Sequence, residues 1–236
     1  MSGTSKSGGR GGGRGKERVK TARRRTASST RWLQRQLNDP YVKKAKADGY
    51  RSRAAYKLIE LDDRFKFLRG AKGVVDLGIA PGGWAQVVRQ RAPKAAVVGI
   101  DLLETDPIDG VTILQMDFMD DDAPEKLKNA LGGPADIVLS DMAANTVGHK
   151  ATDHLRTMGL IEAGLQFAVE ILEPGGAYVA KVLAGGADNN LVTEMKRHFK
   201  TVKHAKPPAS RKGSSEWYVV AQGFKGRPEE EGDVEG

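Results

Sequence analysis

Four charged side chains lie in or beside apolar segments, where charge is rare. Lys181 stands inside the run YVAKVLAGG, and a lysine in such a strand is costly to bury without a partner. Asp141 ends another apolar run (IVLSDMAAN), Lys57 lies in an expected helix (SRAAYKL), and Glu216 opens the last apolar run (SSEWYVVA). Lysines and carboxylates of this kind can hold or transfer a proton. A snorkelling lysine at a sheet edge is the alternative interpretation of Lys181.

Other catalytic chemistries find little support in the composition. The chain has no cysteine, which excludes disulfides, thiolate zinc sites and cysteine nucleophiles. The four histidines show no i, i+4 metal-binding spacing, and no serine triad is evident. We therefore expect no metal site. The histidines are His149, His154, His198 and His204.

A glycine-rich loop, DLGIAPGGW, follows the first expected strand. Gly78, Gly82 and Gly83 let the main chain approach a ligand, and Pro81 stiffens the loop. The spacing differs from the G-x-G-x-x-G dinucleotide fingerprint. Asp101 ends the next strand, where a carboxylate can accept hydrogen bonds from ribose hydroxyls. These features predict an adenosine-type cofactor and leave a nicotinamide dinucleotide open.

A third carboxylate narrows the choice of cofactor. Asp117 ends the following strand and can accept a hydrogen bond from an adenine amino group, beside apolar Met116 and Phe118. Successive strand ends with Asp76, Asp101 and Asp117 resemble the class I methyltransferase pattern, although each could simply cap a turn. Acidic surroundings suit a sulfonium cation better than a pyrophosphate. The pattern therefore favours S-adenosylmethionine.

Short apolar runs alternate with helical patterns between the two ends of the chain. We expect an α/β fold of the class I methyltransferase (Rossmann-like) type, a doubly wound seven-stranded sheet with helices on both faces and an antiparallel last strand pair. Ser29 and Thr30 are expected to cap one early helix, and Ser52 the next. The expected strands are 73–77, 95–100, 111–115, 135–140, 176–183, 201–205 and 216–223, and the main helices are 83–91, 123–131, 152–172 and 188–199.

Charge is distributed unevenly along the 236 residues, whose net charge is +8. Residues 1–27, rich in Gly and Arg, predict a disordered basic arm that could tether RNA. Residues 28–224 are expected to form the methyltransferase domain, and residues 225–236 a disordered acidic tail. Basic segments on both sides of an acidic middle favour a polyanionic partner, while solvated charge that only aids solubility is the alternative. Because no apolar run reaches 18 residues, we expect a soluble, cytoplasmic protein without membrane association.

An ordered series of motifs over about residues 27 to 224 is similar to the FtsJ/RrmJ family of ribosomal RNA 2′-O-methyltransferases. Two departures are Ala144, where the family commonly has proline, and Ile79, where it often has alanine. Both are apolar exchanges away from the charged positions. The motifs are SSTRWLQ, RSRAAYKL, VVDLGIAPGGW, DLLETDPIDGV, QMDF, LSDMAAN, LEPGG, VAKV and SRKGSSEWYVVA.

The resemblance implies a catalytic set of two lysines and two acids, with Lys181 as the candidate base. Burial and the charge of Lys57 would favour its neutral amine, whereas Asp141 would favour the ammonium, so an orienting role stays open. Glu216 would balance Lys57 and position the ribose. The implied catalytic residues are Lys57, Asp141, Lys181 and Glu216. The implied cofactor contacts are Gly82, Trp84, Asp101, Asp117 and Asp141, to which the loop itself adds Gly78, Pro81 and Gly83.

The same resemblance implies a uridine 2′-hydroxyl of large-subunit (23S) ribosomal RNA as the acceptor, presented in an assembled particle. Nothing in the sequence demands more than a monomer, which is the state we expect. Three alternatives remain. The chain could methylate tRNA or another RNA, act on a small molecule as a class I methyltransferase, or serve as a catalytically silent RNA-binding assembly factor.

Overall fold

The computed structural model describes residues 26–144, 150–183 and 189–227. The chain divides into two compact units, one up to Lys44 and one from Ala45 onward. The first unit contains helix α1 (Ala27–Asn38) and the beginning of α2 (Pro40–Ala47). Almost all of the predicted basic arm, and most of the predicted acidic tail, lie outside the described residues.

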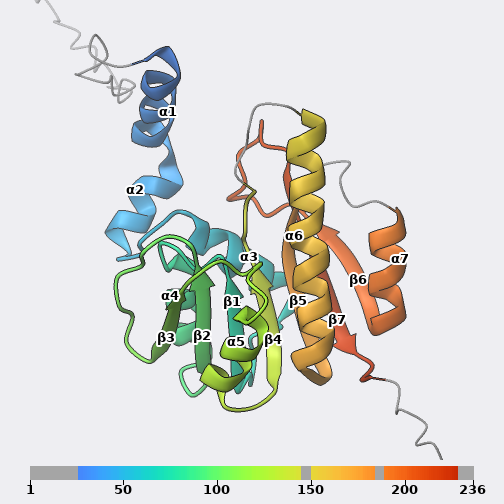
Figure 1. Cartoon of the computed structure of the whole chain (residues 1–236). Coiled ribbons are helices and arrows are strands. Elements are labelled where there is room, and N and C mark those ends of the chain that lie inside the picture. Colours follow the sequence, from blue (N-terminus) through green and yellow to red (C-terminus); the bar gives the residue numbers. More distant parts are fainter. Residues whose placement is uncertain (1–25, 145–149, 184–188, 228–236) are drawn as a thin grey trace, which may run out of the picture. The chain divides into compact units, whose positions relative to one another are not determined.

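The second unit is built on a seven-stranded sheet with the strand order β3-β2-β1-β4-β5-β7-β6 (Figure 1). The first five strands pair in parallel, and β7 runs antiparallel to both neighbours. The predicted mixed sheet is confirmed. Its strands are β1 (Gly73–Leu77), β2 (Ala96–Asp101), β3 (Val111–Gln115), β4 (Ala135–Ser140), β5 (Leu172–Leu183), β6 (Phe199–Ala205) and β7 (Glu216–Phe224).

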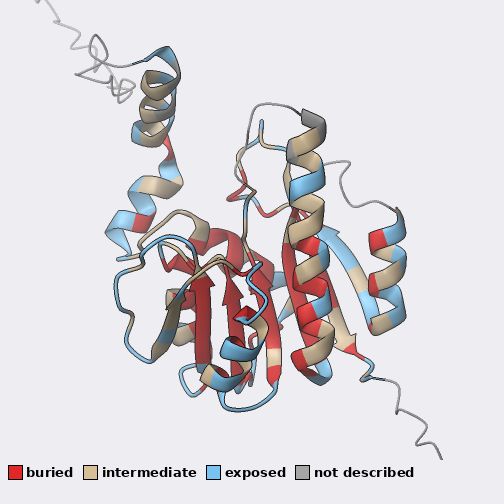
Figure 2. Ribbon diagram, viewed as in Figure 1, coloured by how far each residue is buried: buried red, intermediate tan, exposed pale blue. Residues whose placement is uncertain are grey.

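Helices cover both faces of the sheet, and the central strands are buried between them (Figure 2). One face packs against α3 and α4, and the other packs against α5, α6 and α7. Burial on both sides explains why the central strands read as nearly continuous apolar runs. The helices are α3 (Ala54–Phe65), α4 (Gly83–Arg91), α5 (Ala123–Leu131), α6 (Lys150–Ile171) and α7 (Asn189–His198).

The antiparallel insertion of β7 has a consequence for the site. The strands β1, β2, β4 and β5 all end at one edge of the sheet, and β7 begins at that same edge. In the register between β5 and β7, Lys181 lies opposite Tyr218, and Leu183 lies opposite Glu216. Residues far apart in the sequence therefore meet where ligands bind in open α/β sheets.

Some local predictions were wrong. Thr26 caps α1, because its Oγ1 accepts the N–H of Ser29 at 3.3 Å, so the helix starts before the predicted caps Ser29 and Thr30. Arg53 occupies the N-cap position of α3 without a capping side chain, and the Ser52 hydroxyl has no hydrogen-bond partner there. Strand β5 also begins four residues before the predicted start, at Leu172.

A close contact fixes α6 against β5. The hydroxyl of Tyr178 donates to the carbonyl of Ile161 at 3.0 Å, and a Cβ added at Gly164 would lie 2.6 Å from that hydroxyl oxygen. The missing side chain at position 164 therefore makes room for the buried phenol.

We expect Gly164→Ala to lower the free energy of unfolding by about 1–3 kcal/mol through overpacking. The loss should largely disappear in a Tyr178→Phe background, where the colliding oxygen is absent. Gly159→Ala is the matched control, since an added Cβ there meets nothing within 4 Å and gains helix propensity. Urea denaturation of the single and double variants measures these values. Equal effects of Gly164→Ala in both backgrounds would contradict the contact.

Candidate active site

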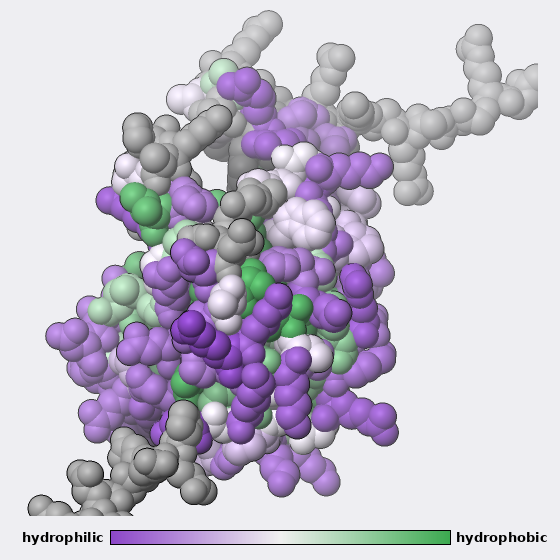
Figure 3. All heavy atoms as spheres, turned by 90° about the vertical axis from the view of Figure 1, so that its right-hand side faces the viewer, coloured by the Kyte–Doolittle hydropathy of each residue, from purple (hydrophilic) through white to green (hydrophobic). Residues whose placement is uncertain are grey.

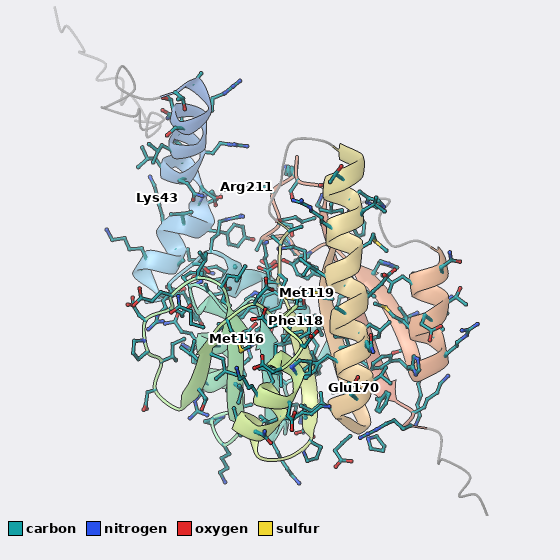
Figure 4. The ribbon with its side chains drawn as sticks, in the orientation of Figure 1. Lys43, Met116, Phe118, Met119, Glu170 and Arg211 are labelled. Atoms are coloured by element: carbon teal, nitrogen blue, oxygen red, sulfur yellow. The ribbon has the colours of Figure 1, made fainter. Side chains whose placement is uncertain are left out.

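A cavity of about 250 Å³ opens at the carboxyl edge of the sheet. Its lining includes Gly78 and three carboxylates, Asp101, Asp117 and Asp141. Apolar side chains complete it, and Figure 4 shows Met116 and Phe118 close together in the segment that follows β3. A cavity lined by both carboxylates and apolar side chains suits a ligand that combines a cation with a flat ring.

The backbone holds two of these carboxylates in place. Asp101 accepts the N–H of Ala80 at 2.9 Å with one oxygen and the N–H of Leu103 at 2.9 Å with the other. Asp117 accepts the N–H of Met119 at 2.9 Å. Asp101 and Asp117 therefore both cap turns, and both also line the cavity. Each acid has lone pairs left for a ligand hydroxyl or amine.

The glycine-rich loop serves two different purposes. Gly78 has a φ of 83°, and a Cβ there would lie 2.9 Å from the backbone nitrogen of Met142, so it allows two loops to meet at the cavity. Gly82 has a φ of 102°, and its added Cβ would lie 2.5 Å from the side chain of Ile108. Gly82 thus admits the neighbouring loop and starts α4.

The remaining predicted cofactor residues do not line this cavity. Pro81, Gly82, Gly83 and Trp84 are absent from its wall. Trp84 is 3% exposed, and its indole donates from Nε1 to the carbonyl of Ala54 at 2.9 Å and packs on Tyr218. Their contact with a cofactor stays a prediction.

Asp76 lies beneath the loop, is fully buried, and has no hydrogen-bond partner for either carboxylate oxygen. Burial, with the negative charges of Asp141 and Asp101, raises the pKa of Asp76 to about 8. Asp76 does not line the cavity, but its raised pKa shows that acidic groups crowd together at Asp76, Asp101 and Asp141, and the two that line the cavity favour a cationic ligand there. The residues therefore fit S-adenosylmethionine, which carries a sulfonium and an ammonium group.

The second half of the site begins with Lys181. Its ammonium lies 3.2 Å from Oδ1 of Asp141 and donates to the backbone carbonyl of the same residue at 2.6 Å. The side chains are 9% and 19% exposed. The buried lysine is thus paired with a carboxylate, which offsets the cost of burying its charge in an apolar strand. The snorkelling alternative is wrong, because the side chain is buried.

Lys57 and Glu216 form the other ion pair, with Nζ and Oε2 3.0 Å apart. Burial raises the pKa of Glu216, but the charge and hydrogen bond of Lys57, together with the charge of Lys181, outweigh burial and hold it below its usual value. Glu216 is therefore a stable carboxylate at neutral pH. Because the charge of Lys181 also lowers the pKa of Glu216, the two ion pairs belong to one cluster.

Tyr218 joins the two pairs, and sequence analysis missed it. Its hydroxyl donates to Oδ1 of Asp141 at 2.9 Å, and Nζ of Lys57 lies 5.6 Å from its ring centroid. Burial and the charges of Asp141 and Glu216 raise the pKa of Tyr218 well above its usual value, so the phenol remains a donor. Strand alternation after Glu216 places Tyr218 on the same face, a signal that could have found it.

The structure therefore brings all four predicted catalytic residues together, and Asp141 belongs to both the cluster and the cavity. An arrangement of this kind can hold a methyl donor on one side of a carboxylate and orient an acceptor hydroxyl on the other.

Residues 50–224 match the family model of the FtsJ-like methyltransferases. The chain belongs to this family. Membership confirms the predicted methyltransferase class and its cofactor, S-adenosylmethionine. The nicotinamide alternative is thereby excluded.

Proteins with similar sequences match nearly the whole chain. A protein named ribosomal RNA large subunit methyltransferase E from Rhizorhabdus wittichii is 76% identical over 94% of this chain and 97% of its own length. One of the same name from Erythrobacter litoralis is 78% identical over 89% of this chain and 96% of its own length. A Plasmodium falciparum crystal structure, assigned as a ribosomal RNA methyltransferase, has a TM-score of 0.67 at 37% identity, covering 75% of this chain and all of that one.

The described residues contain neither a membrane-spanning helix nor a cluster of metal ligands. None of their helices combines the length and the apolar character needed to cross a membrane. Within the same residues, no three His, Cys, Asp or Glu side chains are grouped as metal ligands.

The unusual acid Asp76 gives a pH prediction for the ligand-free protein. Because its pKa is higher in the folded than in the unfolded state, the native state binds the extra proton, and stability falls as pH rises from about 4 towards 8. Asp76→Asn removes this dependence. The free energy of unfolding of the variant, relative to that of the wild type, should therefore rise with pH by at most about 1.4 kcal/mol per pH unit across that range. Denaturation at several pH values, with the exposed Asp121→Asn as control, measures the difference. A difference that stays constant with pH would contradict a protonated Asp76.

Proposed function

We propose that the protein transfers the methyl group of S-adenosylmethionine to a ribose 2′-hydroxyl of large-subunit ribosomal RNA. The observation that carries the proposal is the shared carboxylate of Asp141, which lines the cofactor cavity and holds the ammonium of Lys181. The names of the similar proteins supply the class of RNA. The uridine as acceptor, and an assembled particle as substrate, remain parts of this proposal.

The chemistry requires one bond to form as another breaks. The sulfonium supplies an activated methyl group with a neutral thioether as leaving group. The ribose oxygen bonds to that carbon while the carbon–sulfur bond breaks, and the hydroxyl proton leaves to a base or to water. The protein must therefore align the oxygen with the methyl carbon and favour loss of the proton.

Lys181 is placed for both tasks. Its ammonium has three donors, and the two contacts with Asp141 leave one for the acceptor oxygen. A cation at that oxygen stabilises the negative charge that develops as the proton leaves. In this form Lys181 orients the hydroxyl and makes the loss of its proton easier. To act as the proton acceptor itself, the ammonium must first lose a proton.

Lys57 and Glu216 shape the acceptor side. Their ion pair keeps a cation and a carboxylate at the same sheet edge as Lys181, where a ribose has hydroxyls to donate and accept. The ring of Tyr218 contacts the ammonium of Lys57, and the hydroxyl of Tyr218 donates to Asp141. The Lys–Asp–Lys–Glu cluster therefore favours an alcohol acceptor, and its completeness argues against a catalytically silent factor.

We expect Lys181→Ala to lower methyl transfer by at least about 100-fold, because the cation at the acceptor oxygen is lost. Binding of S-adenosylmethionine should change little, since Lys181 lies outside the cavity wall. The assay uses methyl-labelled S-adenosylmethionine with large-subunit particles from a strain that lacks the enzyme, followed by mapping of the modified nucleotide. Lys126→Ala, an exposed lysine paired with Asp122, is the control and should behave as the wild type.

Two results would contradict the proposal. Turnover by Lys181→Ala at the wild-type rate would remove the role of Lys181. Label in tRNA, in protein or in a small molecule, with none in large-subunit RNA, would overturn the substrate.

A further inference from the structure

Trp217 is a large apolar side chain that remains 37% exposed beside the catalytic cluster. It follows Glu216 directly and lies opposite Val182 of β5, at the edge of the sheet where the acceptor is expected. Neighbouring residues of a strand point to opposite faces. Because Tyr218 is buried on the face covered by α3 and α4, Trp217 belongs to the face covered by α6 and α7.

Lys206 lies beside this indole. Its Nζ is 5.9 Å from the ring centroid of Trp217, and it donates to the carbonyl of Ser214 at 2.6 Å. The hydrogen bond closes the loop between β6 and β7, so the cation is held against the ring. The exposed His204 lies opposite Val219 in the register and therefore shares this face. The indole thus has a fixed cation beside it and an imidazole on the same face of the sheet.

The segment that leads from α7 through β6 towards Trp217 is basic. Residues 196–213 contain seven Lys and Arg and no acidic residue. Figure 3 looks onto the side that carries α7 and β6, where hydrophilic side chains dominate. A partner that satisfies both the basic surface and the indole needs negative charge and flat rings together. Single-stranded nucleic acid has both, because each nucleotide joins a phosphate to a base.

We propose that Trp217 and Lys206 form a stacking platform for an RNA base next to the acceptor nucleotide. The inference rests on the proposed function, because it assigns a further contact to the same RNA. Trp217 follows Glu216, which positions the acceptor ribose, and its side chain lies on the opposite face of the same sheet edge, so the neighbouring base would cross that edge to reach the platform. Stacking of the neighbouring base would hold that ribose at the cluster, and Lys206 would meet the phosphate beside it.

The test compares Trp217→Leu, which keeps an apolar side chain but loses the aromatic face, with Trp217→Phe, which keeps a ring. Trp217→Leu should raise the Kd for deproteinised large-subunit ribosomal RNA, and the KM for particles, by about 5- to 100-fold. Trp217→Phe should recover most of this loss. Lys206→Ala should weaken RNA binding and reduce its salt dependence, whereas Lys200→Ala, an exposed lysine at the opposite end of β6, should do neither.

Each other outcome has a definite meaning. Equal RNA binding by the wild type, Trp217→Leu and Trp217→Phe would overturn the platform. An equal loss of RNA affinity in Trp217→Leu and Trp217→Phe would also overturn it and would assign Trp217 to packing. A loss seen with intact particles but not with deproteinised RNA would overturn it too and would assign Trp217 to a protein contact. Urea denaturation shows whether each variant is folded. If the wild type methylates large-subunit particles while Trp217→Leu binds RNA normally, only the platform fails; if the wild type methylates no such particle, the proposed function fails.

Discussion

The ammonium of Lys181 and the carboxylate of Asp141 lie 3.2 Å apart, in a place where neither charge would be stable alone. Lys181 comes from the interior of β5, and Asp141 from the residue that follows β4. Each charge makes the burial of the other tolerable. In the proposed function the pair also joins two tasks, because Asp141 lines the cavity assigned to the methyl donor while Lys181 belongs to the cluster assigned to the acceptor.

The sheet topology provides the rest of the cluster. A strand inserted antiparallel between β5 and β6 starts at the edge where the parallel strands end. It therefore carries Glu216 and Tyr218 to Lys181, and Trp217 to the opposite face of the same edge. The early helix α3 adds Lys57 from the other side of the site. Four chain segments thus meet at one point, although only the fold, and no sequence neighbourhood, connects them.

Much of the fold could be predicted from the sequence, because buried parallel strands and amphipathic helices have distinct periodicities. Strands β1, β3 and β4 and helices α4 and α5 have the predicted bounds. Helix caps were harder, since several neighbouring Ser and Thr residues could serve and only the local backbone decides between Thr26 and Ser29. Strand alternation alone places Tyr218 on the same face as Glu216, but its position opposite Lys181 depends on the register between β5 and β7, which is a pairing of distant segments.

The cofactor loop shows the same limit. The pattern DLGIAPGGW predicted a ligand site at the first strand–helix turn, and the structure has a cavity there that is lined by Gly78, Asp101 and Asp117. A sequence pattern does not reveal side-chain direction, however, and the Trp84 ring packs into the core instead. Asp76 was read as one of three strand-end carboxylates, whereas its burial without a partner is visible only in three dimensions.

The most direct measurement of the shared role of Asp141 is the behaviour of Asp141→Asn in two assays, S-adenosylmethionine binding by calorimetry and single-turnover methylation of large-subunit particles. The substitution removes the charge but keeps the size of the side chain. We predict that affinity for the methyl donor falls several-fold and that the single-turnover rate at saturating donor falls by at least about 10-fold. A loss confined to one of the two quantities would contradict a carboxylate that serves both halves of the site.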